Sequence, residues 1–94
     1  MLEKDIVAKI KKALMKKGAW VIKTHGSLHV SGLPDIIACY EGRFIGIEVK
    51  RPETRNTVTE RQQAVLDQIA AAGGIAGVAT SVEEALRLAG LDPS

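Results

Sequence analysis

The chain has few of the residues and none of the long apolar runs that are typical of several classes of protein. Its 94 residues include a single cysteine, Cys39, which excludes an internal disulfide framework and a cysteine-based zinc site. No apolar run approaches the ~20 residues that cross a membrane, and the stretch MLEKDIVAKIKK lacks the apolar centre of a signal peptide. We therefore expect a cytoplasmic protein with no membrane partner. The length suits one compact domain over residues 1–94.

The sequence also lacks a module that reads base sequence, since no helix-turn-helix or zinc-finger pattern is present. Positive charge, in contrast, is concentrated in one part of the chain. Residues 1–61 hold 12 of the 13 Lys and Arg residues but only 7 of the 11 Asp and Glu residues. A basic half suits a polyanion recognised through its phosphates and shape, although a solvated lysine-rich helix gives the same pattern.

Hydrophobic periodicity and glycine positions predict helices and strands in the order α-β-β-β-α-β-α. Apolar residues at helical spacing mark a helix over 3–17, and capping-box spacings at Thr59 and Ser81 open helices that run to about 72 and 88. β-rich or apolar runs predict strands over 19–24, 35–40, 43–51 and 75–79. The expected fold class is α/β, a mixed β-sheet flanked by helices.

Further expectations concern the surroundings of these strands. The apolar run over 36–39 is typical of a strand covered on both faces, so we expect Cys39 in the core. Gly46 leaves space for a ligand or a second chain to approach. Trp20 is expected in the core or in an interface. Residues 52–58 read as a polar, mobile linker suited to contacts with phosphates.

Three charged side chains interrupt the central pair of strands. Asp35 follows Pro34 at the start of one strand. Glu48 and Lys50 lie two residues apart near the end of the next, so their side chains share one face. Two carboxylates and an ammonium on one face are unfavourable as plain structure, because buried charge must be paired or bound to a cation. We therefore predict a site for a hard divalent metal, Mg²⁺ or Mn²⁺.

Two more polar positions have local explanations as well as functional ones. Glu3 and Asp5 lie in the first turn of a helix, where the helix dipole favours carboxylates. Gln62 lies on the inward edge of an apolar stripe, where its amide needs a partner, or it serves only as a cap. Gln63 is one position round the helix and more exposed. On the residues alone, the roles of Glu3 and Gln62 stay open.

The spacing P-D-x(12)-E-x-K, which runs from Pro34 to Lys50, is that of the PD-(D/E)xK nucleases. The agreement continues outside this core with an early Glu3 and with the motifs G-x-P-D at 32–35, E-V-K at 48–50, Q-x-x-V-L at 62–66, G-x(2)-A-x-V at 73–78 and S-V-E-E-A-L at 81–86. Through these motifs the chain resembles the VRR-NUC family from Glu3 to Gly90. That family is similar to archaeal Holliday-junction resolvases.

The resemblance implies a restriction-endonuclease-like αβββαβα core and a single VRR-NUC nuclease domain over residues 1–94. It implies a metal-dependent, structure-specific DNA endonuclease, expected to act as a homodimer on four-way (Holliday) junctions. The alternatives are a nicking or flap nuclease and a catalytically silent DNA-binding module with the same fold. A dimer interface is expected to be hydrophobic and to use Trp20, Phe44 or the strand 75–79.

The resemblance also implies a role for each matching residue. The metal ligands would be Asp35, Glu48, Glu3 and the backbone carbonyl of Val49. The catalytic residues would be Asp35, Glu48, Lys50, Gln62 and Glu3. Asp5 and Gln63 are the alternatives by a shift of register. Positive and imidazole side chains that are candidates for contact with DNA are Lys9, Lys12, Lys16, His25, Arg51 and Arg55.

Overall fold

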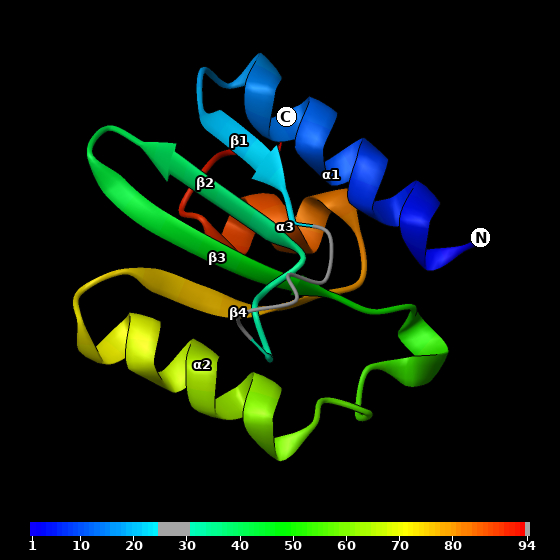
Figure 1. Cartoon of the computed structure of the whole chain (residues 1–94). Helices are drawn as coiled ribbons and strands as arrows, with labels where there is room; N and C mark the ends of the chain where they lie inside the picture. Colours follow the sequence, from blue (N-terminus) through cyan, green and yellow to red (C-terminus); the bar gives the residue numbers. More distant parts are fainter. Residues whose placement is uncertain (25–30, 94) are drawn as a thin grey trace.

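The computed structural model describes residues 1–24 and 31–93, and the predicted helices and strands are present in the predicted order. They are α1 (Glu3–Lys16), β1 (Trp20–Lys23), β2 (Ile36–Tyr40), β3 (Arg43–Val49), α2 (Glu60–Ala71), β4 (Ile75–Ala79) and α3 (Val82–Leu88) (Figure 1). A short 3₁₀ turn, η1 (Pro52–Thr54), follows β3. The fold is α/β and compatible with a restriction-endonuclease-like core. None of the helices in the described part of the chain is long and apolar enough to cross a membrane.

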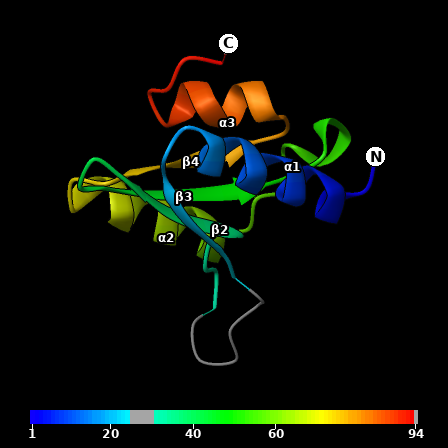
Figure 2. The same cartoon turned by 90° about the horizontal axis from the view of Figure 1, so that it is seen from above.

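The four strands form one mixed sheet in the order β1-β2-β3-β4. β1, β2 and β3 pair antiparallel, whereas β4 returns through α2 and pairs parallel with β3. Figure 2 shows the sheet nearly edge-on, with α3 on one side and α2 on the other. Ile36 lies opposite Ile47, so the next residues outward, Asp35 and Glu48, occupy adjacent positions at the end of the sheet.

The main core lies between the sheet and the helices α1 and α3. Ile10 and Leu14 of α1 are fully buried in the same cluster as Ile45 and Ile47 of β3. Because successive strand residues face opposite sides, this alternation in β3 leaves Glu48 on the other face. On that face α2 packs against β3 and β4.

The β1–β2 part of that second face is open, which corrects two expectations and excludes one of the two alternatives for Trp20. Cys39 is exposed and is not a core residue, because α2 packs farther along the sheet. β2 is therefore not covered on both faces. Trp20 is 62% exposed, so it is not a core residue either. The register aligns Trp20, Cys39 and Phe44 across three strands, and directly opposed residues project from the same face.

Gly46 also faces this side of the sheet, but the space beside it is filled. A Cβ atom there would lie 2.9 Å from Cδ1 of Ile69 in α2 and 3.2 Å from Cγ of Pro34. The prediction that Gly46 leaves space for a ligand or a second chain is therefore wrong. Its missing side chain instead lets α2 and Pro34 pack closely against β3, beside the start of β2.

Gly46→Ala is expected to lower the free energy of unfolding by about 1–3 kcal/mol, because the added methyl group overlaps Ile69. Ile69→Val removes the Cδ1 atom that this methyl meets and keeps the Cγ2 atom that packs against Gly74. The double variant should therefore be less destabilised in urea unfolding than the sum of the two single variants. Strictly additive effects would show that Ile69 does not fill this space.

Candidate active site

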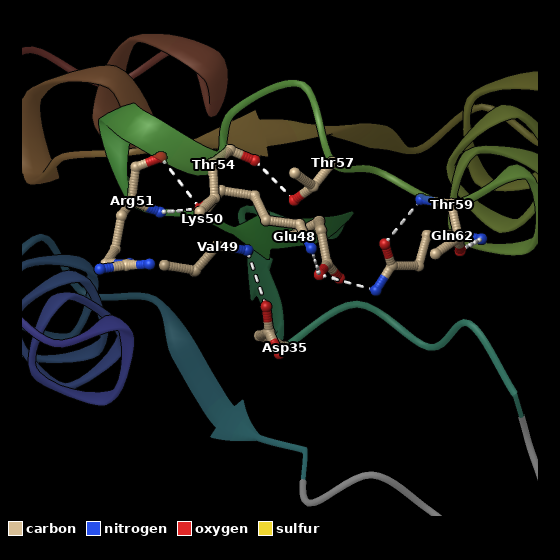
Figure 3. Close-up of polar contacts among 9 residues, drawn as sticks. All are labelled: Asp35, Glu48, Val49, Lys50, Arg51, Thr54, Thr57, Thr59 and Gln62. Atoms are coloured by element: carbon tan, nitrogen blue, oxygen red, sulfur yellow. Dashed lines mark hydrogen bonds and ion pairs between the residues drawn. The ribbon is translucent and has the colours of Figure 1, made fainter.

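The three charged residues predicted from the sequence meet at one end of the sheet (Figure 3). Asp35 directly precedes β2, Glu48 lies in β3 and Lys50 directly follows it. Thr24, just after β1, fixes the entry to β2. Its hydroxyl donates to the carbonyl of Pro34 at 2.6 Å, and its N–H donates to the carbonyl of Asp35 at 2.9 Å.

The carboxylate of Asp35 is bound to the neighbouring strand. Its Oδ2 atom accepts a hydrogen bond from the N–H of Val49 at 2.8 Å, drawn as a dashed line in Figure 3. Val49 thus contacts Asp35 through its N–H. The use of the Val49 carbonyl as a metal ligand stays a prediction.

Glu48 is nearly fully buried, with 3% of its surface exposed. Its Oε2 atom accepts a hydrogen bond from Nε2 of Gln62 at 3.1 Å and lies 3.7 Å from Nζ of Lys50. Its Oε1 atom is buried and has no hydrogen-bond partner among the described residues. A buried carboxylate oxygen without a partner is unfavourable, so this atom marks a position where a cation would be stabilised.

The pKa of Glu48 is raised to about 7. Burial is the largest cause, followed by the charge of Asp35; Lys50 acts in the opposite direction, and the charge of Glu3 raises the pKa further. Lys50 alone therefore does not offset the negative charge gathered here. A divalent cation fits this donor set, because hard cations prefer carboxylate oxygens.

Glu3 lies at the start of α1, and its charge acts on Glu48. It does not complete a cage of ligands in this structure. Within residues 1–24 and 31–93, no three His, Cys, Asp or Glu side chains gather closely enough to hold a metal ion. Asp5, the alternative by register, is exposed to solvent.

Gln62 links α2 to the site. Its Oε1 atom accepts the N–H of Thr59 at 3.0 Å, and the hydroxyl of Thr59 accepts the N–H of Gln62 at 3.0 Å, which together form a capping box. Its Nε2 atom meanwhile donates to Glu48. Gln62 thus combines the two roles left open by the sequence, the cap and the contact with the site. Gln63 donates to Asp67 at 2.9 Å on the exposed side of α2.

Arg61 is a residue near the site that the sequence did not single out. Its Nε atom donates to the carbonyl of Ser31 at 3.2 Å and to the hydroxyl of Ser31 at 3.0 Å. A Cβ atom on Gly32, which has a φ of +78°, would lie 2.8 Å from the carbonyl oxygen of Arg61. The glycine of G-x-P-D thus lets α2 approach the chain leading to Asp35, and this glycine was the available signal.

Comparison with known protein families agrees with this geometry. The sequence model of the archaeal Holliday junction resolvase family, Hjc, matches residues 4–85. The chain belongs to this family. The matched residues include Asp35, Glu48, Lys50 and Gln62, whereas Glu3 precedes the match by one position. No curated protein matches the chain.

In this resolvase-family chain, the segment after β3 forms hydrogen bonds of its own, and the mobility expected over 52–58 stays a prediction. The N–H of Arg51 donates to the hydroxyl of Thr54 at 3.1 Å, and the N–H of Thr54 donates to the carbonyl of Arg51 at 3.0 Å. The hydroxyl of Thr57 donates to the carbonyl of Thr54 at 2.7 Å. These bonds stabilise the turn η1, which follows the catalytic candidate Lys50 in the chain (Figure 3).

Arg55, predicted as a phosphate contact in that linker, is engaged within the fold. Its Nη2 atom donates to the hydroxyl of Thr80 at 3.1 Å and forms an ion pair with Glu84. At the other end of the segment, the N–H of Lys50 donates to the carbonyl of Ala79 at 3.0 Å. The resolvase-family chain thus fastens both ends of this segment to the junction between β4 and α3.

The sequence indicated Glu84 only as part of a capping box. The cap itself is present, since the hydroxyl of Ser81 accepts the N–H of Glu84 at 3.1 Å. The carboxylate of Glu84 instead accepts from the N–H and the hydroxyl of Thr80, both at 2.7 Å. The hydrogen bond from the Thr80 hydroxyl is the largest cause that lowers the pKa of Glu84 to about 2, and Arg55 lowers it further.

Four of the remaining candidates for DNA contact lie within the described residues. Lys9, Lys12 and Lys16 are exposed on α1. Arg51 pairs with Glu53 at 3.7 Å. His25 lies outside the described residues.

Glu84→Gln is expected to lower the free energy of unfolding at pH 7 and to lose this effect in acid. With a pKa of about 2 in the folded state against an ordinary 4.5, the carboxylate stabilises the fold fully above pH 4.5. Its contribution is lost as the pH falls from 4.5 towards 2. Urea unfolding of the wild type and the variant at pH 7 and about pH 3 should show the difference shrinking.

Glu83→Gln is the matched control, because Glu83 is exposed and makes one ion pair with Arg87 at 3.8 Å. This variant should change the free energy of unfolding by less than about 0.5 kcal/mol. A difference between wild type and Glu84→Gln that is equal at both pH values would contradict the assigned network.

Proposed function

We propose that this protein is a Mg²⁺- or Mn²⁺-dependent endonuclease that hydrolyses phosphodiester bonds in branched DNA, above all in four-way junctions. The observation that carries the proposal is the paired carboxylates of Asp35 and Glu48, with a buried Oε1 atom of Glu48 that lacks a partner, beside Lys50. Membership of the resolvase family supports branched DNA as the substrate. The resemblance to VRR-NUC domains is compatible with the same chemistry.

The residues of the site divide the work among them. Asp35 and Glu48 would hold the cation, which supplies Lewis-acid activation of a water molecule and of a phosphate oxygen when it is bound. Lys50 places a positive charge where the attacked phosphate gains negative charge, and as an ammonium it helps to orient the attacking water. Gln62 occupies Oε2 of Glu48, so that Oε1 is left for the cation.

Two further ligands and a cellular setting belong to the same proposal. Glu3 would approach from the start of α1, where its charge already acts on Glu48. The backbone carbonyl of Val49 would complete the inner shell of the cation. A cytoplasmic, reducing setting is compatible with the unpaired Cys39.

Asp35→Asn and Lys50→Ala are each expected to lower cleavage by at least about 100-fold. The first removes a carboxylate that would hold the cation, and the second removes a positive charge that stabilises the transition state. The assay uses labelled four-way junction, flap, splayed and duplex DNA, with Mg²⁺, Mn²⁺ or a chelator. Asp67→Asn is the control, since it removes an exposed carboxylate of α2 and should leave the rate of cleavage unchanged.

Several outcomes would decide against this assignment. Cleavage by either site variant at the wild-type rate would exclude the assigned roles. Binding without cleavage under every metal would favour a catalytically silent DNA-binding module, and preferred cutting of flaps or nicking of duplex would favour those alternatives. Thermal unfolding tests the metal site without measuring activity. Mn²⁺ should raise the melting temperature of the wild type but not that of Asp35→Asn.

We further propose a homodimer joined through the open sheet face. Trp20, Ile22, Cys39 and Phe44 are exposed on this face, and apolar exposure of this kind is typical of an interaction surface. The other candidate, the strand 75–79, is partly covered by α2 and α3. A twofold pairing of identical faces would supply two sites to a junction that itself has approximate twofold symmetry.

Trp20→Ser is expected to shift the protein from a dimer to a monomer in sedimentation, because the exposed ring would be a central anchor of the interface. Met15→Ser is the control, since Met15 is 55% exposed but lies on α1, away from this face. A wild-type protein that sediments as a monomer at assay concentrations would exclude the dimer.

A further inference from the structure

Two groups of cationic side chains differ in their partners. One group has carboxylate partners, in the pairs Lys50–Glu48, Arg51–Glu53, Arg55–Glu84 and Arg87–Glu83. The other group lies on α1 and at the end of β1, where no ion pair with a described residue neutralises Lys11, Lys12, Lys16 or Lys23. Cations of the first group are neutralised within the fold, whereas those of the second group have their charge available for a ligand.

The four lysines of the second group surround a single groove of about 480 Å³ between α1 and β1. The other residues that line it are the apolar Ala8 and Met15, and no acidic residue lines it. Figure 1 shows α1 running alongside β1, so the groove follows the outer edge of the sheet. Four like charges around one hollow repel one another, and a polyanion relieves that repulsion.

One end of the groove lies next to the candidate active site. Lys23 is paired with Ile36, the residue that follows Asp35. The next residue, Thr24, donates its N–H to the carbonyl of Asp35. A polyanion seated in the groove is therefore within one strand of the carboxylate that would hold the metal.

We propose that this groove binds the sugar–phosphate backbone of the DNA arm next to the cleaved bond, an inference that rests on the proposed nuclease function. The phosphates meet the lysines while the sugars lie over the two apolar residues. Lys11 and Lys23 thereby join Lys12 and Lys16 as phosphate contacts. Arg55, which Glu84 holds, does not take part in binding.

The test is the salt dependence of binding to a fluorescent four-way junction in chelator, between 50 and 200 mM KCl. Each lysine–phosphate contact contributes about 0.9 to the slope of log K against log [salt]. Replacing Lys11, Lys12, Lys16 and Lys23 by glutamine should lower the slope by about 3.6. Over this fourfold range of salt, the variant would then lose roughly 100-fold less affinity than the wild type.

Two control variants separate charge from shape and from position. Replacing the same four lysines by arginine keeps the charges and should keep the slope. Arg43→Gln removes an exposed charge at the opposite end of β3 from Glu48 and should also keep it. In steady-state cleavage with Mg²⁺ and a varied junction concentration, the glutamine variant should raise KM and leave kcat unchanged, because the carboxylates and Lys50 are untouched.

A slope that falls by 2 or more in the glutamine variant supports the groove, and a smaller fall overturns it. A smaller fall would leave an acidic protein segment as the better occupant. If the wild type binds and cleaves junctions with a steep slope that the variant retains, the groove fails while the nuclease function stands. If the wild type neither binds nor cleaves DNA, the nuclease function itself fails, and the groove proposal with it.

Discussion

The rest of the site depends on two carboxylates held side by side, one of them almost fully buried. Antiparallel pairing of β2 and β3 sets Asp35 beside Glu48, whatever the charge of their side chains. Every neighbouring donor then reduces the resulting repulsion, namely the N–H of Val49, the ammonium of Lys50 and the amide of Gln62. These groups still leave one oxygen of Glu48 without a partner and its pKa near 7. The fold thus maintains an unfavourable arrangement that a cation would relieve, which is typical of functional sites.

This arrangement persists because the opposite face of the same strands is well packed. Ile45, Ile47 and Val49 are fully buried against α1 and α3, and they lock the register of β3. A slip by one residue would turn Glu48 into that apolar core, so the register of the core also fixes the site. α2 is coupled to the site in a similar way, because the side chain of Gln62 both caps the N-terminus of the helix and donates a hydrogen bond to Glu48.

The sequence was sufficient to predict the elements and the charged trio, because both follow from local periodicity and spacing. Which parts of the sheet are covered by a helix could not be predicted in this way. Cys39 and Gly46 have local surroundings that suit several environments, and the position of α2 decides that the first is exposed and the second is buried. The ion pair of Arg55 with Glu84 joins residues far apart in the chain. Local sequence therefore could not distinguish Arg55 from a loop cation that is free to bind phosphate. The role of Gln62 was ambiguous because its side chain makes both contacts, the helix cap with Thr59 and the hydrogen bond to Glu48.

The two proposed surfaces, for a second copy and for DNA, share the short edge strand β1. Trp20 and Ile22 project towards the open apolar face, whereas Lys23 projects to the side where α1 packs, because strand side chains alternate. A second copy bound to the open face would therefore leave the lysine groove accessible. Conversely, a polyanion in the groove would not displace a partner from Trp20. The two proposed surfaces are compatible because they lie on opposite sides of a strand only four residues long.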